Sequence, residues 1–175
     1  TGLFGSAADA TFRNIGLTNV NISGSGYGNG GLLGYGERVA IENAYVTGKV
    51  TGTATATGGL VGEIENALIN NSYVLGDVSG RHHVGGLAGS FSSSTITNAY
   101  ATGAVSGIDY IGGLVGFSTM SNIAKVYATG AVSGTNYIGG LVGHANYETL
   151  IRGTFATGKV TGNTDVGGLV GQGDN

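Results

Sequence analysis

The chain has 175 residues and contains no cysteine and no proline, and charged residues make up only 10% of it. Without cysteine it has no disulfides, no thiolate metal ligands and no cysteine nucleophile. Without proline, every backbone N–H remains available as a donor, which suits a fold held by continuous backbone hydrogen bonding.

The small number of charges also restricts the partners that the chain is expected to have. Seven Lys and Arg stand against ten Asp and Glu, for a net charge of −3, and the basic residues are scattered. A nucleic-acid binder would show a basic stripe, so we expect no nucleic-acid partner. No apolar run approaches the roughly 20 residues that cross a bilayer, so we expect no membrane span.

Glycine is abundant, at 37 residues, and it recurs at fixed positions. The string Gly-Gly-Leu-Val-Gly, with close variants, starts at positions 1, 30, 58, 85, 112, 139 and 167, so successive starting positions differ by 29, 28, 27, 27, 27 and 28. Spacing this regular indicates a repeat architecture with about six units of 27–29 residues. We therefore predict that residues 1–175 form one repeat domain.

A second string keeps the same period and predicts the fold class. It reads AYATGAVSG from Ala99, and related strings begin at Ala44, Ser72, Val126 and Thr154. Each repeat thus contains three short runs of strand-forming residues, with glycines between them that we interpret as corners of positive φ. No run has a helical period. These features predict an all-β fold, a parallel β-solenoid (β-helix) with three short strands per coil.

The sequence leaves the hand of the coil open and argues against the main competing repeat fold. We predict a right-handed coil by analogy with parallel crossover connections, although the sequence does not fix the hand. A leucine-rich repeat has a similar period, but its Leu signature is absent here.

Three sets of side chains recur at one position per coil and are predicted to stack as ladders along the solenoid. The leucine and valine ladders are expected to face inward. Strict alternation with Val50 places the aromatic ladder outside, whereas Leu17 in the first coil and Phe155 in the last favour the inside, and we predict the inside. The ladders are Leu32, Leu60, Leu87, Leu114, Leu141 and Leu169; Val50, Val78, Val105, Val132 and Val160; and Tyr45, Tyr73, Tyr100, Tyr127 and Phe155.

Polar residues form ranks of the same kind. We interpret four asparagines, one per coil in the first four coils, as a hydrogen-bonding ladder at a bend. Two ranks of Thr and Ser raise ice binding as an alternative, since flat hydroxyl ranks on β-solenoids serve that purpose in some proteins. The asparagines are Asn14, Asn43, Asn71 and Asn98, and the hydroxyl ranks are Thr47, Thr102, Thr129 and Thr157, interrupted by Leu75, and Thr51, Ser79, Ser106, Ser133 and Thr161.

The residues that carry chemistry elsewhere show no convergence in the sequence. His82 and His83 would point to opposite faces of a strand, and His144 is more than two coils away, so we predict surface-loop histidines and no metal site. Glu37 and Glu65 are expected to stack on adjacent coils as a solvated pair, with calcium binding or glycoside hydrolysis as the alternatives. We predict no catalytic residues, no metal and no cofactor.

Taken together, GGLVG followed by ITNAYATGAVSG closely resembles the GLUG repeat of bacterial surface proteins, and residues 12–24 (FRNIGLTNVNISG) resemble a variant that often opens such arrays. The resemblance covers essentially the whole chain. It implies an extracellular or bacterial cell-surface location and a role as stalk, spacer or adhesive surface. Some peptidases of this kind carry a His-Glu-x-x-His zinc motif in a separate domain, and no such string occurs here.

The expected function is a non-catalytic structural or display segment, a stalk or filament, of an extracellular surface protein. The alternatives are an adhesin surface that binds a glycan or a host protein, and an ice-binding solenoid. Because neither end of the sequence carries a polar cap, we expect either that it is a segment of a longer array or that copies stack end to end.

Overall fold

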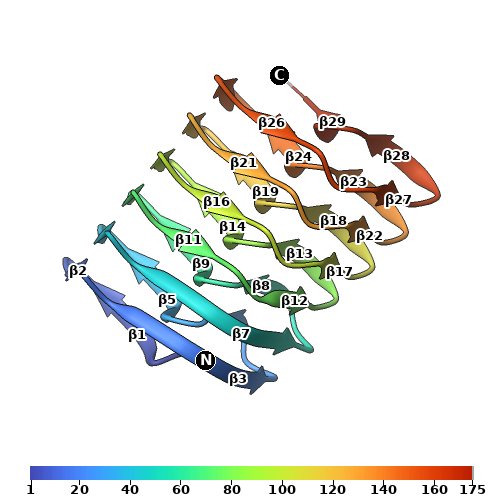
Figure 1. The fold of residues 1–175 in the computed structure, drawn as a ribbon. Helices are drawn as coiled ribbons and strands as arrows, with labels where there is room; N and C mark the ends of the chain where they lie inside the picture. The colour runs from blue at the N-terminus through green and yellow to red at the C-terminus, as the bar shows by residue number, and fades with distance from the viewer. Residues whose placement is uncertain (175) are drawn as a thin grey trace.

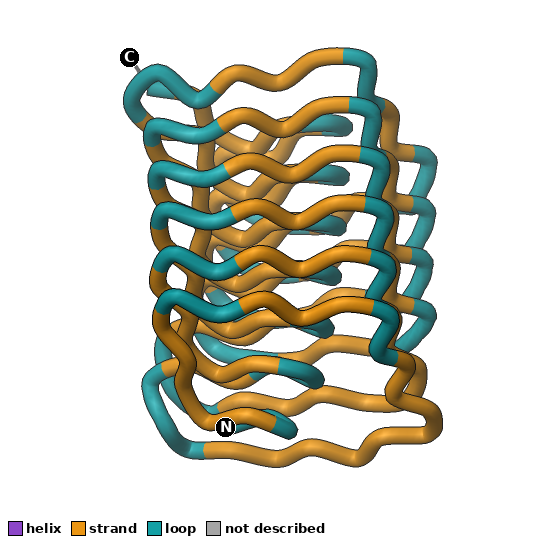
Figure 2. Tube along the Cα trace, turned by 90° about the vertical axis from the view of Figure 1, so that its left-hand side faces the viewer, coloured by secondary structure: helices purple, strands orange, loops and turns teal. Residues whose placement is uncertain are grey.

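The computed structural model describes residues 1–174, and these residues form strands, turns and loops but no helix. The chain winds into a stack of about six coils, with each coil lying directly on the one before it (Figures 1 and 2). Every pair of adjacent strands is parallel, which confirms the predicted all-β parallel solenoid. No helix in the described residues is long and apolar enough to cross a membrane.

Four parallel sheets run the length of the stack, and we name them A to D in the order in which a coil visits them. Sheet A contains β1 (Phe4–Ala8), β5 (Leu33–Glu37), β9 (Val61–Glu65), β14 (Ala88–Ser92), β19 (Val115–Thr119), β24 (Val142–Asn146) and β29 (Val170–Gly173). Sheet B contains β2 (Thr11–Arg13), β6 (Ala40–Glu42), β10 (Leu68–Asn70), β15 (Thr95–Thr97), β20 (Asn122–Ala124) and β25 (Leu150–Arg152).

Sheet C is bent and receives two strands from each of the later coils. It contains β3 (Gly16–Gly24), β7 (Tyr45–Gly52), β11 (Tyr73–Val74), β12 (Asp77–Ser79), β16 (Tyr100–Ala101), β17 (Val105–Ser106), β21 (Tyr127–Ala128), β22 (Val132–Ser133), β26 (Phe155–Ala156) and β27 (Val160–Thr161). Sheet D contains β4 (Gly28–Asn29), β8 (Ala56–Gly58), β13 (His82–Gly85), β18 (Asp109–Gly112), β23 (Asn136–Gly139) and β28 (Thr164–Gly167).

The register between coils follows the sequence repeat. Phe4 pairs with Leu33, and Leu33 pairs with Val61. Val61 pairs with Ala88, and Ala88 pairs with Val115. Each step in these pairings equals the step between successive copies of the glycine motif, so equivalent side chains lie one above another along the stack.

The predicted count of three strands per coil is wrong, because a later coil has five, such as β9 to β13. The first predicted run breaks at a corner residue in the left-handed region, Asn71 or Asn98. The third run breaks within the Gly-Gly pair, between Gly112 and Val115. The first and third runs thus each become two strands in different sheets, because the chain has to turn inside them.

The interpretation of the repeat glycines as corners of positive φ is also wrong. Only Gly48 and Gly153 have positive φ among the described glycines, whereas 17 non-glycine residues do. Asn, Asp and other residues occupy the left-handed corners, where the short polar side chain of Asn is tolerated better than most. The motif glycines are needed for a different reason, which is that backbone segments come into close contact at these positions.

Each glycine of Gly-Gly-Leu-Val-Gly faces a different piece of backbone. A Cβ on Gly112 would collide with the carbonyl oxygen of Val115, in the turn of its own coil. One on Gly113 would collide with the carbonyl oxygen of Gly140, in the next coil. One on Gly116 would come within 2.5 Å of the Val84 nitrogen in sheet D. The motif therefore lets the chain turn, stack and pack against sheet D with no room for a side chain.

The core is divided into two parts. The larger part fills the space among sheets A, B and C and contains the leucine ladder, whose five members from Leu32 to Leu141 are 0% exposed. Leu169 is 36% exposed, because no described coil lies on it. The smaller part, between sheets C and D, holds the valine ladder from Val78 to Val132, with Val160 packed against its end. Val50 is also buried.

Candidate functional site

The aromatic ladder lies on the outer surface of sheet C, so the predicted inward placement is wrong. The rings of Tyr45, Tyr73, Tyr100, Tyr127 and Phe155 stack with centroids 4.8–5.2 Å apart and planes within 7° of parallel. The next residue of each strand points inward instead, as Val74 and Ala101 do at 1% exposure. Within the ladder, neighbouring rings cover each other's faces, so the ladder presents ring edges and hydroxyl groups outward.

The first coil shows why the sequence analysis wrongly placed the aromatic ladder inside. Leu17 does not occupy the ladder position, because it pairs with Val46 and Gly16 pairs with Tyr45. A Cβ on Gly16 would collide with the Tyr45 ring, so the ring covers this glycine and the ladder ends there. A one-residue error in alignment changes the side of a strand on which a residue is placed.

Ranks of hydroxyl groups run beside the aromatic ladder on the same outer surface. The Thr rank lies two residues further along each coil, and Thr102, Thr129 and Thr157 are exposed. The second rank stacks in register across the glycine corner, with Thr51 paired to Ser79 and Ser79 to Ser106. The hydroxyls of Thr51 and Ser79 are 3.2 Å apart. We call the aromatic ladder and these two ranks the hydroxyl face.

The hydroxyl face carries few charges. Between the two ranks, the outward position is occupied by Lys49, Asp77, Ala104, Ala131 and Lys159 in successive coils. The carboxylate of Asp77 accepts a hydrogen bond of 2.8 Å from the Ala104 N–H. The three central coils therefore offer a neutral partner a nearly uncharged surface with regularly spaced donors and acceptors.

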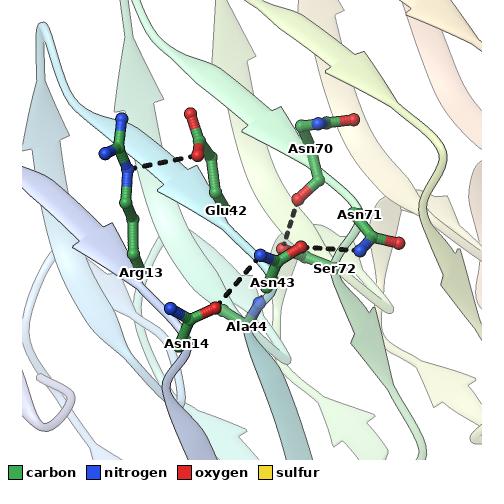
Figure 3. Close-up of polar contacts among 8 residues, drawn as sticks. All are labelled: Arg13, Asn14, Glu42, Asn43, Ala44, Asn70, Asn71 and Ser72. Carbon is green, nitrogen blue, oxygen red and sulfur yellow. Dashed lines mark hydrogen bonds and ion pairs between the residues drawn. The ribbon is translucent and has the colours of Figure 1, made fainter.

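The predicted asparagine ladder is present at the corner between sheets B and C (Figure 3), and each of its residues lies two positions before a sheet C strand begins. Asn43 Nδ2 donates to Asn14 Oδ1 at 3.1 Å, and Asn71 Nδ2 donates to Asn43 Oδ1 at 2.6 Å. Asn98 departs from the pattern and donates to Asn70 Oδ1 at 3.0 Å. All four ladder residues have φ between 48° and 55°, so the side chains bond across coils from left-handed corners.

Buried serines form a second set of corner contacts that the sequence analysis missed. Ser72 Oγ donates to the Asn70 carbonyl at 2.9 Å and accepts from the Ala44 N–H of the preceding coil at 3.1 Å (Figure 3). Ser94 and Ser121 make the same pair of bonds at the corner between sheets A and B, in the next two coils. Each serine directly follows a residue of positive φ, which the sequence does not reveal.

The three histidines are not surface-loop residues, contrary to the prediction. His82 and His83 belong to β13, and His144 belongs to β24 and is only 9% exposed. His83 and His144 lie on facing sheets and contact the same two aromatic residues, Tyr110 and Phe117. Distance along the stack had suggested that they were unrelated, but sheet D folds back on sheet A and brings them together.

The acidic residues stack as predicted, with Glu37 paired to Glu65 on adjacent coils. Glu37 forms an ion pair with Arg38. Burial, followed by the charge of Glu65, raises the pKa of Glu63. No three His, Asp or Glu residues in the described part of the chain converge as a metal site. A shallow depression at the corner between sheets A and B is lined by Asp9, Arg38, Asn66 and Ser93 among others, and the carboxylate of Asp9 there is bound by Arg38.

Comparison with known proteins supports the repeat on a separate basis. A family model described as the GLUG motif matches residues 53–79, 80–106, 109–133 and 134–161, which together are more than half of the chain. No curated protein and no solved structure matches it significantly. The first 52 residues lie outside the matched segments, although their strands join the same parallel sheets, with one register shift between β3 and β7. The chain belongs to the GLUG-motif family.

Proposed function

We propose that this chain is a non-catalytic structural segment of an extracellular bacterial surface protein, which holds its neighbours in the polypeptide apart. The observation that carries the proposal is the continuity of all four parallel sheets through the stack, with one register shift, between β3 and β7. The residues that recur are those that stack, whereas His, Asp and Glu fall at irregular positions. A surface location is consistent with the family, whose repeats are associated with extracellular surface proteins.

A structural segment should resist extension, and single-molecule force spectroscopy measures this property. We expect the chain, held at its two ends, to unfold at a measurable force and in steps that correspond to one or more coils, because each coil contacts only its neighbours. A variant with a disrupted central coil, Gly113→Ala, should unfold at lower force. Extension at negligible force, like that of a flexible Gly-rich linker, would contradict the structural role.

The hydroxyl face supports a second candidate function, adhesion to a neutral glycan. The face carries few charges, and its aromatic rings repeat with centroids 4.8–5.2 Å apart, beside the Thr rank. A linear polysaccharide also presents hydroxyls at regular intervals, so its sugar units can hydrogen-bond to successive coils. Because the ring faces are covered by one another, the contact would involve hydroxyls and ring edges rather than stacking on a sugar face.

Binding to insoluble neutral polysaccharides, with a glycan array beside it, tests this candidate. Thr102→Lys and Thr129→Lys place charge in the middle of the hydroxyl face and should reduce binding at least tenfold. Met120→Lys serves as the matched control, because Met120 is 55% exposed at the corner between sheets A and B. Equal loss in all three variants, or no binding by the native chain, would reject adhesion. Ice shaping by the native chain, lost in the two Thr variants, would assign the face to ice instead.

A further inference from the structure

Sheet D folds back against the outer surface of sheet A, and the two backbones touch where the last glycine of each motif lies. A Cβ on Gly116 or Gly143 would come within 2.7 Å of backbone atoms in sheet D. Outward side chains of sheet A therefore meet side chains of sheet D along a seam. In the middle coils this seam is filled by five rings, His83, Tyr110, Phe117, Tyr137 and His144, which we call the aromatic seam.

The rings of the aromatic seam interlock. His83 stacks on Phe117 with centroids 5.0 Å apart and planes 16° apart, and it meets the Tyr110 ring edge-on at 5.1 Å. His144 has the complementary arrangement, stacked on Tyr110 at 5.6 Å and edge-on to Phe117 at 5.4 Å. Tyr110 also stacks on Tyr137 at 4.7 Å. Each imidazole thus packs as an aromatic ring would, and for His83 this packing favours the neutral form.

The backbone holds three of these rings in place at a conformational cost. His83, Tyr110 and Tyr137 occupy the equivalent position in β13, β18 and β23, and their φ angles are 45°, 60° and 60°. The left-handed region is unfavourable for bulky residues. The ring contacts across the seam therefore oppose a local tendency of these strands to relax, and loss of those contacts would release them.

The charges around the seam favour a neutral His83. Burial, followed by the charges of His82 and His144, lowers the pKa of His83 to about 4. The nearby carboxylates are engaged elsewhere: Asp109 lies 3.1 Å from His82 Nδ1, and Asp174 lies 2.9 Å from His144 Nε2. Within residues 1–174, His144 Nδ1 is buried without a hydrogen-bonding partner, and His83 has no ion pair. Glu63, on the outer side of sheet A, is paired in register with Tyr35 and Ser90.

We propose that the aromatic seam is an acid-sensitive latch, which holds sheet D on sheet A while His83 is neutral and opens around β13 and β18 when His83 is protonated. The direction follows from linkage. An unfolded histidine has a pKa of about 6.5, so the seam's contribution is fully present above that pH. It is lost as the pH falls towards 4, and below 4 the loss levels off because the folded state is protonated too.

Titration of the three imidazoles by NMR, together with amide hydrogen exchange, tests the latch without any variant. His83 should titrate near 4. The protection factors of β13 and β18 should fall by roughly two orders of magnitude between pH 7 and pH 4, as a shift of this size implies, while those of sheet B change less. A His83 that titrates near its unperturbed value, or uniform loss of protection in all sheets, would overturn the proposal.

Two variants separate His83 from general acid effects on carboxylates. His83→Phe keeps a stacking ring that cannot be protonated, so it should remove the acid response of β13 and β18. His82→Gln, at the neighbouring position, should retain that response. If His83→Phe kept the full response, the latch would be rejected. Should this variant fail to fold, the NMR titration of the native chain still decides the question.

Discussion

The first two coils and the later coils follow the same path but differ in how they are built. In the first two, β3 and β7 are nine and eight residues long and run through the corner of sheet C. In the later coils the same stretch is divided into two strands of two or three residues, such as β11 and β12. The pairing of β3 with β7 also contains a register shift between Leu17 and Val20.

The two regions also differ in the smaller core. Its sheet D positions hold Val84, Ile111 and Ile138 in the later coils, all 0% exposed. The corresponding residues of the earlier coils are Asn29 and Thr57, which are also 0% exposed. Asn29 Oδ1 and Thr57 Oγ1 have no hydrogen-bonding partner among residues 1–174. The same backbone path therefore accepts an apolar or a polar side chain in the smaller core, provided that the motif glycines and the register of sheet D are kept.

The largest effect is expected from breaking what both regions share, the close backbone contact at the second motif glycine. Gly113→Ala would drive a Cβ into the carbonyl oxygen of Gly140, and we expect destabilisation of about 3 kcal/mol or more, measured by denaturant unfolding. Gly168→Ala is the matched control at the same motif position, because nothing lies within 4 Å of the added Cβ. Equal effects of the two variants would mean that stacking contact is not the reason for the glycine.

Exchanging polar and apolar side chains in the smaller core should change stability by an intermediate amount, with opposite sign in the two regions. Val84→Thr buries a hydroxyl in the apolar part and should destabilise the chain by about 2 kcal/mol. Thr57→Val removes a buried hydroxyl that has no protein partner and should stabilise it by about 1 kcal/mol. Thermal and denaturant unfolding measure both. If Thr57→Val proved destabilising, the hydroxyl must be hydrogen-bonded to internal water.

Substitutions at the corner between sheets B and C should also change stability in opposite directions in the two regions, but by smaller amounts. Asn43→Ala removes two side-chain bonds and places alanine at φ 52°, so a loss of about 1–2 kcal/mol is expected. In the fifth coil, Lys125 occupies the equivalent corner at φ 54°, and Lys125→Asn should add a few tenths of a kcal/mol. Unfolding curves that showed no change for Asn43→Ala would mean that the ladder adds no net stability.

The smallest effect is expected from the ion pairs of the first coils. Arg38 binds Asp9 and Glu37, and its hydrogen bonds to Asp9 lower the pKa of that carboxyl. A lowered carboxyl pKa adds stability above the unfolded pKa that disappears as pH falls, but these groups are exposed and solvent screens them. Arg38→Gln should therefore leave the melting temperature nearly unchanged at pH 7, with or without added salt. A large drop would show that the pair is a structural anchor.

The regular coils were also the part of the fold that could be predicted. The glycine motif that recurs from position 1 to position 167 determined the number of coils, the parallel pairing and the families of residues that stack, because a parallel stack repeats each residue's environment. The first coils are less regular, and there Leu17 was matched to the wrong neighbour. The Asn ladder was predictable because a short amide at a recurring corner has few other partners.

Other features depended on contacts between segments that are distant in the sequence. The split of the first run into two strands followed from left-handed corners at residues such as Asn71, which strand propensity does not reveal. The aromatic seam required knowledge that sheet D folds back on sheet A, since His83 and His144 are more than two coils apart along the chain. The buried serines follow left-handed corner residues and accept hydrogen bonds from N–H groups of the preceding coil, and neither feature can be read from the sequence.

By itself, the sequence determined that this chain is a parallel stack, how many coils it has and which residues share a ladder, because those properties follow from a regular recurrence of residue types. The tertiary structure alone decided which face each ladder occupies and why the motif needs glycine. Both depend on where the chain turns within a coil and on which backbones come into contact. A residue's identity and period do not carry that information. The structure was therefore needed to place the ladder tyrosines on the outer surface and His83 and His144 in the aromatic seam.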